Sequence, residues 1–496
     1  MILRLVGHNY KYAVEQIQMA LFPETRPVYS TDPIISSDVL NAVSRLSFGL
    51  TYAQATTSIR CGDRVSHGTA RVARSRLAGK LITDRLLQRV IKQSFYRAAV
   101  KYTGTHPVWG SLTGIRPAKL VSAALEAGAN SKTAADMLMR EYYVAPERAV
   151  MCLDAAKAAL DMKRKLEPRD IALYVGIPFC PTRCAYCSFV SNSVEKSFAL
   201  IDPFVQALLR ETGAVSMAVR ELGLRVRSVY IGGGTPTALP DEALDSVMAA
   251  LSSSFDLSNV LEYTVEAGRP ETLSQQKIDI IGAGGAGRIC INPQSMSDQV
   301  LSAIGRRHTA EDVLSAVGMV RRSKMTLNMD VIAGLPCDDP GGFSETLDSV
   351  MELEPENITV HTLSLKKGSR ILLEGTPIPG ATEVEKMLAY ASQRLKTGGY
   401  SPYYLYRQKF TSGGFENTGW RLPGFDGIYN ICMMEELCTV LSLGGGGVTK
   451  IVSPGGRIER IFNAKYPREY IMQSGTLEAK IGKIKTLICD DRKPRR

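Results

Sequence analysis

From Asp170 onward, short apolar runs alternate with longer amphipathic segments. The apolar runs have the length and the β-branched content of buried strands, and the segments between them have helical spacing. Six repeated β–α units predict a parallel sheet with helices outside, and six units suit a partial barrel better than a short open sheet. We predict strands at 172–177, 228–231, 263–266, 288–292, 326–332 and 357–363, and helices at 203–222, 242–253, 272–281, 298–304, 310–322 and 343–353.

Before Asp170 the pattern is mixed. Apolar residues recur at near-helical spacing between Thr69 and Val100, and we interpret this stretch as one or two basic amphipathic helices. A loop at 110–117 precedes a helix around 120–127, and an alanine-rich helix at 145–166 ends before Pro168, which cannot continue it. A domain boundary is therefore expected near residue 168.

After the sixth unit, a predicted helix at 383–397 leads into a region rich in glycine and aromatic residues, which ends in a basic tail. We expect an α/β protein with three parts. These are a basic N-terminal α+β domain at 1–168, a partial (β/α)6 barrel at 169–380 and a C-terminal domain at 381–496.

Composition places the chain among ordinary globular proteins, because 45% of its 496 residues are hydrophobic and 22% are charged. Wholesale disorder, collagen and coiled coil are excluded. The net charge of +11 is uneven: residues 1–170 hold 25 Lys and Arg against 14 Asp and Glu, whereas the remainder holds 35 against 35. The basic region could steer an anionic substrate, dock a redox partner or form a solvated face, and the sequence leaves these three roles open.

No stretch reaches the roughly 18 consecutive apolar residues of a membrane span. The first residues also lack the apolar core of a signal peptide. We therefore expect a cytoplasmic protein, in which cysteines are more often metal ligands or free thiols than disulfides.

Three of the ten cysteines fall together, in a Cys-x₃-Cys-x₂-Cys loop formed by Cys180, Cys184 and Cys187 after the first predicted strand. Three thiolates on a short loop can ligate three irons of a [4Fe–4S] cluster and leave the fourth iron for an exogenous ligand. A structural zinc site would want four protein ligands, and no fourth Cys or His follows at a suitable spacing. The other seven cysteines are interpreted as core or surface thiols.

This loop is the signature of the radical SAM superfamily, and its surroundings resemble the oxygen-independent coproporphyrinogen III oxidase (dehydrogenase) family. The matching pieces arrive in the family's order: Gly-Gly-Gly-Thr-Pro at 232–236, Glu266, Asn-Pro-Gln-Ser at 292–295, Gly-Arg-Arg-His at 305–308 and Asp-Val-Ile-Ala-Gly-Leu-Pro at 330–336. The basic N-terminal region, with Leu-Thr-Gly-Ile-Arg-Pro at 112–117, and the block at 402–409 resemble the HemZ-type branch.

The resemblance implies that the three cysteines hold a [4Fe–4S] cluster and that S-adenosylmethionine, in one or two molecules, binds beside it. It predicts that the cofactor is contacted by nine residues: Tyr174, Tyr186, Gly233, Gly234, Thr235, Glu266, Gln294, Arg306 and Asp330. Tyr174 is the one residue for which the resemblance also suggests a catalytic part, although a strand tyrosine is more often packing. His308 and His361 are interpreted as structural.

The implied reaction is oxidative decarboxylation of coproporphyrinogen III to protoporphyrinogen IX, supplied with electrons by a donor such as flavodoxin or ferredoxin. The family pattern Glu-x-Asn-Pro is replaced here by Glu266-Ala-Gly-Arg-Pro, and Phe189 stands where decarboxylating members carry a further cysteine. Phenylalanine there is also the pattern of the haem-chaperone relatives, so a haem-binding chaperone is the alternative. A radical enzyme acting on RNA is a third reading, but aromatic residues suited to base stacking are scarce in the basic region.

Overall fold

The chain folds into two compact units, residues 1–153 and residues 154–496. The computed structural model describes residues 1–23, 25–30, 38–187, 192–366, 368–408, 412–453 and 456–490. Helix α5 (Pro146–Lys165) begins in the first unit and ends in the second. A division into three domains at residues 168 and 380 stays a prediction. Among the helices in the described parts, none is both long enough and apolar enough to cross a membrane.

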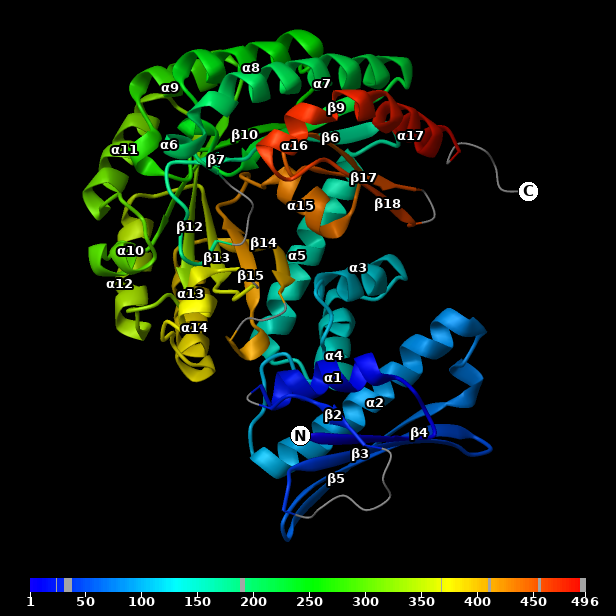
Figure 1. The fold of residues 1–496 in the computed structure, drawn as a ribbon. Helices are drawn as coiled ribbons and strands as arrows, with labels where there is room; N and C mark the ends of the chain where they lie inside the picture. The colour runs from blue at the N-terminus through cyan, green and yellow to red at the C-terminus, as the bar shows by residue number, and fades with distance from the viewer. Residues whose placement is uncertain are drawn as a thin grey trace. The chain divides into compact units, whose positions relative to one another are not determined.

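The first unit is built on a five-stranded sheet with the order β2-β1-β3-β4-β5. Helices α1 (Lys11–Leu21) and α2 (Gly79–Thr103) pack on one face of it (Figure 1), where Val14, Ile17 and Phe95 are fully buried. The strands are β1 (Ile2–Val6), β2 (Val28–Tyr29), β3 (Asn41–Phe48), β4 (Tyr52–Cys61) and β5 (Arg64–Ala73).

The predicted helix between Thr69 and Val100 is wrong in its first part. Residues up to Ala73 belong to β5, and the helix begins only at Gly79. Along β5 buried and exposed residues alternate, with Gly68 and Ala70 facing α2 and Arg71 exposed. The strand period of two was not recognised in the sequence, because two of the four buried positions of β5, Ser66 and Gly68, are not apolar residues.

Three further helices complete the first unit: α3 (Ala118–Glu126), α4 (Ser131–Tyr142) and the start of α5. The predicted helices around 120–127 and 145–166 are confirmed by α3 and α5. Helix α4 was not predicted. It begins after Asn130, whose side chain accepts a hydrogen bond from the Thr133 amide at 2.8 Å.

The second unit is built on an eleven-stranded sheet with the order β14-β15-β13-β12-β11-β10-β9-β6-β16-β17-β18. Its centre is the predicted set of six strands, all of them parallel to their neighbours within the set. The α/β partial barrel is therefore confirmed. The six are β6 (Asp170–Ile177), β9 (Arg225–Gly233), β10 (Glu262–Glu266), β11 (Arg288–Gln294), β12 (Thr326–Ala333) and β13 (Asn357–Thr362).

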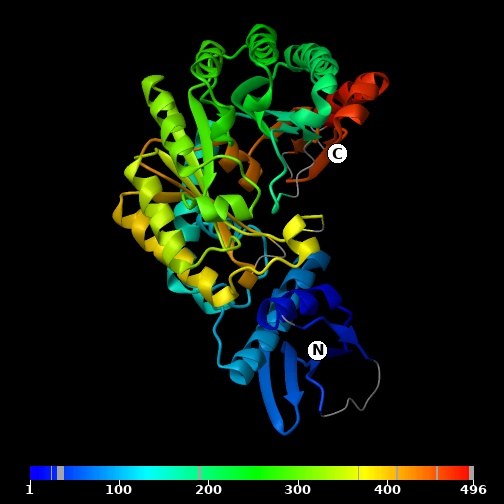
Figure 2. The same cartoon turned by 60° about the vertical axis from the view of Figure 1, so that its left-hand side comes forward.

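Helices of the β–α units lie outside these strands (Figures 1 and 2). Each has buried apolar residues on one side, such as Phe204 and Leu208 of α7, and several begin at side-chain caps such as Thr309 with Asp312. The helices are α7 (Ile201–Glu221), α8 (Asp241–Ser254), α9 (Gln275–Ala283), α10 (Asp298–Ala303), α11 (Ala310–Arg322) and α12 (Pro340–Glu352).

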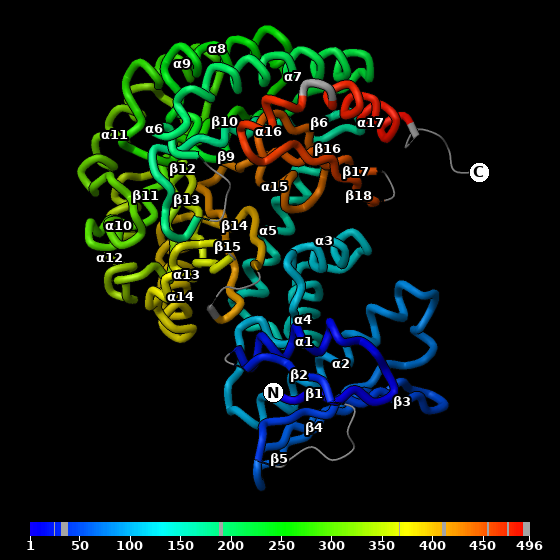
Figure 3. Tube along the Cα trace, in the orientation of Figure 1, coloured from blue at the N-terminus to red at the C-terminus, as the bar shows by residue number. Residues whose placement is uncertain are grey.

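The C-terminal residues extend the sheet at both of its edges (Figure 3). At one edge β15 (Glu416–Arg421) pairs antiparallel with β13, and β14 (Ser401–Arg407) pairs with β15. At the other edge β16 (Thr439–Gly444) runs parallel to β6 and is followed by the antiparallel strands β17 (Val448–Val452) and β18 (Ile458–Phe462). The helices of this region are α13 (Arg370–Glu374), α14 (Ala381–Thr397), α15 (Ile428–Glu435), α16 (Pro467–Met472) and α17 (Leu477–Asp490).

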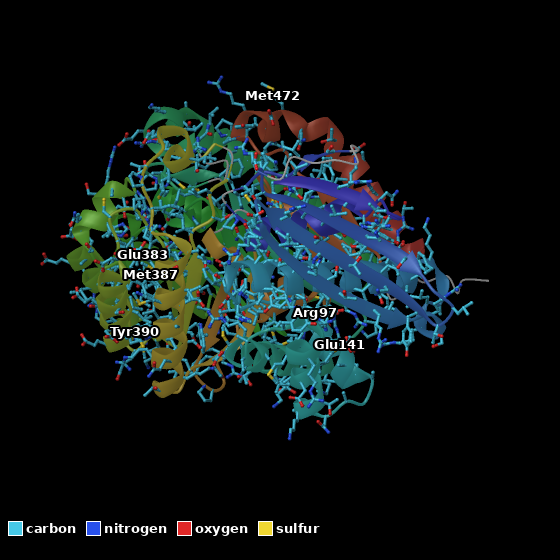
Figure 4. All side chains as sticks on the ribbon, turned by 90° about the horizontal axis from the view of Figure 1, so that it is seen from below. Arg97, Glu141, Glu383, Met387, Tyr390 and Met472 are labelled. Atoms are coloured by element: carbon cyan, nitrogen blue, oxygen red, sulfur yellow. The ribbon has the colours of Figure 1, made fainter. Side chains whose placement is uncertain are left out.

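Helix α14 packs on α12. Glu383, Met387 and Tyr390 follow one another along it (Figure 4). Met387 is fully buried, and the Tyr390 hydroxyl donates to Asp348 of α12 at 2.6 Å. The predicted helix at 383–397 is thus confirmed as an outer layer over the last β–α unit.

Candidate functional site

The three clustered cysteines lie on the loop that follows β6. Cys180 closes the short strand β7 (Phe179–Cys180), which pairs with β8 (Asn192–Ser193), and the Cys187 amide donates to the Cys184 carbonyl at 3.1 Å. All three cysteines line one cavity of about 360 Å³. In the described residues, no three Cys, His, Asp or Glu side chains converge as they would on a single metal ion. A four-iron cluster does not require such convergence, because each thiolate ligates a different iron.

The C-terminal ends of the parallel strands form the wall of this cavity. Gly233 of β9, Glu266 of β10, Gln294 of β11 and Asp330 of β12 all line it. Tyr186, Gly234, Thr235 and Arg306 line it as well, so every predicted cofactor residue except Tyr174 reaches the cavity that the cysteines reach. Ligand binding at this edge is the general behaviour of α/β barrels.

Backbone hydrogen bonds connect the glycine loop after β9 to the start of the cysteine loop. The Gly234 amide donates to the Ile177 carbonyl and the Thr235 amide to the Phe179 carbonyl, each at 2.7 Å. A Cβ on Gly234 would lie 2.4 Å from the Phe179 oxygen and 3.0 Å from the Cys180 sulfur. No residue with a side chain fits there, so the glycine is needed for the two loops to approach.

Two acids and a histidine face one another in the cavity. The Tyr230 hydroxyl donates to Glu266 at 2.5 Å, and His361 Nε2 lies 3.5 Å from an Asp330 oxygen. Burial raises the pKa of Glu266 to about 7, with help from the charge of Asp330 and against the hydrogen bond from Tyr230. Burial opposes protonation of His361, but its contacts with Asp330 and Asn417 outweigh burial and raise the pKa of the histidine.

Several polar atoms on the wall have no hydrogen-bond partner in the described part of the protein. They are Asn292 Oδ1, Gln294 Oε1, Arg306 Nε and Asn417 Nδ2. The rest of the Arg306 guanidinium is held in place, since Nη1 donates to the Gly268 carbonyl at 2.9 Å and Nη2 to the Tyr186 hydroxyl at 3.1 Å. Buried polar groups usually find partners, so this wall fits a polar ligand such as S-adenosylmethionine.

Tyr174 packs beside the cavity and is not one of its lining residues. Its ring stacks with those of Tyr230 and Tyr429 at centroid distances of 6.3 and 5.9 Å. The packing interpretation of this strand tyrosine agrees with these contacts. A catalytic part for Tyr174 stays a prediction. Phe189 lies outside the described residues.

Other residues of the cavity were not predicted. Tyr404, Tyr406 and Gln408 enter it from β14 and the residue after it, at alternate positions of one strand. His361 lines it too, although it was interpreted as structural. The alternation at 404, 406 and 408 could have predicted that these three side chains lie on the same face of a strand. A lone histidine offers no comparable pattern.

Comparison with known proteins agrees with this geometry. A family model described as the Radical SAM superfamily matches residues 174–350. The chain is 37% identical over 378 residues to the oxygen-independent coproporphyrinogen-III oxidase-like protein HemZ of Bacillus subtilis. This match covers 74% of this chain and 75% of the relative. It is 26% identical over 310 residues to the heme chaperone HemW of Haemophilus influenzae, over 62% of this chain and 76% of the relative.

A solved structure of coproporphyrinogen III oxidase (HemN) from Escherichia coli, described as a radical SAM enzyme, has the same fold. It superposes with a TM-score of 0.51 at 21% identity, over 67% of this chain and 79% of that one. At this identity the likeness concerns the fold alone.

Proposed function

Because the chain belongs to the radical SAM proteins of the oxygen-independent coproporphyrinogen III oxidase-like family, in its HemZ-type branch, we propose that it oxidatively decarboxylates coproporphyrinogen III to protoporphyrinogen IX. The observation that carries the proposal is that the three cysteines and eight of the nine predicted cofactor residues line one cavity at the ends of the barrel strands.

In this proposal the chain's residues divide into two groups. Cys180, Cys184 and Cys187 would hold the [4Fe–4S] cluster, and the glycine loop with Glu266, Gln294, Arg306 and Asp330 would hold S-adenosylmethionine. When bound, this pair supplies one-electron radical chemistry that removes a hydrogen atom from an unactivated carbon. The protein's part is to orient the reactants and to keep water away, which the burial of Gln294 and Arg306 supports.

The substrate's carboxylates would meet positive charge in the cavity. Lys366 and Arg306 line it, and the raised pKa of His361 favours its charged form. The unpartnered Arg306 Nε can donate a hydrogen bond to a carboxylate, and a nearby cation compensates the carboxylate's charge in a water-poor site. These groups support a tetracarboxylate as substrate. A low-potential electron donor such as flavodoxin or ferredoxin would supply one electron for each propionate, and an external electron acceptor must take up the electron that is released as CO₂ leaves.

The second candidate is a haem-binding chaperone. It is favoured by the matches to proteins named heme chaperone HemW, one of which extends over 76% of the relative's length. Decarboxylation is preferred because the relative named for coproporphyrinogen-III oxidase likeness is more similar, at 37% identity against 26%.

One anaerobic experiment separates the two candidates. The reconstituted protein is mixed with reductant, S-adenosylmethionine and coproporphyrinogen III, and products are followed by mass. Loss of two carboxyl groups together with formation of 5′-deoxyadenosine is the expected result. Stable haem binding without any decarboxylation would remove the enzyme proposal and leave the chaperone.

A pair of cysteine variants controls this experiment. Cys184→Ala is expected to abolish both the cluster absorbance and turnover, because the loop has only three thiolates to offer. Cys489→Ala, at an exposed cysteine of α17, is the matched control and should retain both. Turnover that survives Cys184→Ala would contradict the assigned chemistry.

A further inference from the structure

A buried guanidinium touches one of the three clustered cysteines. Arg269 follows β10 and is only 3% exposed. Its Nη1 lies 2.9 Å from the Cys184 sulfur, and its Nη2 donates to the Thr182 hydroxyl at 2.5 Å. Because a guanidinium keeps its charge in proteins, Arg269 brings a fixed positive charge to the cysteine loop.

The opposite edge of the guanidinium is held by an acid. Arg269 Nε donates to Glu271 Oε1 at 2.9 Å, and the other oxygen of Glu271 lies 3.2 Å from Nδ1 of the buried His308. The carboxylate therefore fixes the direction in which the arginine points. Because the arginine lies between the carboxylate and the thiol, the negative charge of Glu271 is further from Cys184 than the positive charge of Arg269 is.

The contact cannot be explained by the needs of S-adenosylmethionine alone. Arg306 already offers an unpartnered Nε to the cavity, whereas the nitrogens of Arg269 are directed to Cys184, Thr182 and Glu271. A hydrogen bond to a ligating sulfur and a nearby positive charge both stabilise the more negative, reduced form of an iron–sulfur cluster. The effect is strong where water is scarce, as it is around a residue this buried.

We propose that Arg269 raises the reduction potential of the cluster held by Cys180, Cys184 and Cys187, through its charged hydrogen bond to the Cys184 sulfur. Arg269 is a positioning and tuning residue that acts through the cysteine. Glu271 moderates it by opposing part of its charge. The inference rests on the proposed function insofar as it takes these cysteines to hold a cluster.

The test is an anaerobic redox titration of the reconstituted full-length protein, with the reduced cluster followed by electron paramagnetic resonance. Arg269→Gln is expected to lower the electron affinity of the cluster at least tenfold, which for a one-electron couple is about 59 mV toward lower potential. Glu271→Gln is expected to shift the potential in the opposite direction. Arg269→Lys, which keeps the charge, should lie nearer to the wild type than Arg269→Gln.

Arg183→Gln is the matched control. Arg183 precedes Cys184 directly in the chain but is exposed, and its Nη2 donates to the Gly368 carbonyl at 3.2 Å. Water screens such a charge, so its removal should leave the potential unchanged.

The outcomes separate the two proposals. Equal potentials in wild type and Arg269→Gln, or shifts of the same sign in Arg269→Gln and Glu271→Gln, would overturn the tuning role, since a disturbed fold has no reason to produce opposite signs. Absence of a cluster in the wild-type protein after reconstitution, seen in its iron content, would instead overturn the proposed function.

Discussion

At the scale of single residues, Glu266 is the group whose protonation matters most for the cavity. The ordinary pKa of 4.5 is raised to about 7 when the carboxyl is buried beside Asp330. Between these two values the folded protein binds more protons at this site than the unfolded chain does. The free energy of unfolding therefore falls as the pH rises from about 4.5 to about 7, and the whole contribution of Glu266 is lost above this range.

Glu266→Gln should remove this dependence. We expect the variant without cofactors to gain stability relative to wild type between pH 5 and pH 8, by no more than about 3 kcal/mol. Urea unfolding at the two pH values measures the difference. Glu385→Gln, at an exposed glutamate of α14, is the control and should show no comparable change. A constant difference between Glu266→Gln and wild type across this range would show that the carboxyl is charged throughout.

The sequence predicts those site residues whose signal is local. The three cysteines and the glycine loop lie within short stretches, and each stretch follows a strand that its own apolar pattern predicts. The contact of Arg269 with Cys184 joins residues 85 positions apart. No spacing rule reports such a contact, because it depends on how the loops after β6 and β10, two strands separated by β9, meet in space.

At the scale of elements, the same distinction explains the strands. The six central strands are buried on both faces and stand out as apolar runs. Strands β3 to β5 carry polar or charged residues on one face, and β14 to β18 become strands by pairing with β13 and β6 or with each other. Whether these segments form strands depends on partners far away in the sequence. The local pattern of apolar and polar residues therefore does not predict them.

Helix α2 packs closely on β5 at Gly68. A Cβ on Gly68 would lie 2.1 Å from the Ser94 carbonyl oxygen and 2.5 Å from the Ala98 amide nitrogen of α2. Gly68→Ala is therefore expected to push the helix off the sheet and to destabilise the first unit by about 1–3 kcal/mol.

The two tryptophans allow this to be measured unit by unit, because buried Trp109 lies in the first unit and buried Trp420 in the second. In a Trp420→Phe background, the fluorescence of Trp109 should show a lower urea midpoint for Gly68→Ala. Gly114→Ala is the control, since a Cβ there meets only a leucine methyl at 4.0 Å. Equal midpoints for both variants would mean that α2 and β5 adjust without cost.

At the scale of the whole molecule, the positive charge belongs almost entirely to one unit. Residues 1–153 hold 20 Lys and Arg against 10 Asp and Glu, while residues 154–496 hold 40 against 39. On the sheet of the first unit, Arg45, Arg60 and Arg71 are exposed on three neighbouring strands. Like charges this dense repel one another and oppose compaction.

Salt should therefore stabilise the first unit selectively. Raising the ionic strength from about 0.1 M to about 1 M shortens the screening length from roughly 10 Å to roughly 3 Å. We expect the midpoint of thermal unfolding to rise more for the transition reported by Trp109 than for the one reported by Trp420. Equal shifts in the two transitions would indicate a general salt effect and not relief of repulsion.

The position of β6 inside its sheet has a consequence for the synthesis of the protein. Strand β6, which leads to the cysteine loop, pairs with β9 on one side and with β16 on the other, and the Gly445 amide after β16 donates to the Gly176 carbonyl at 2.9 Å. A growing chain that has left the ribosome only as far as β13 carries the cysteine loop after a strand that still lacks one neighbour. Full pairing of the strand that precedes the cysteine loop therefore requires translation as far as β16, so assembly of the proposed iron–sulfur cluster is expected to follow translation of nearly the whole polypeptide.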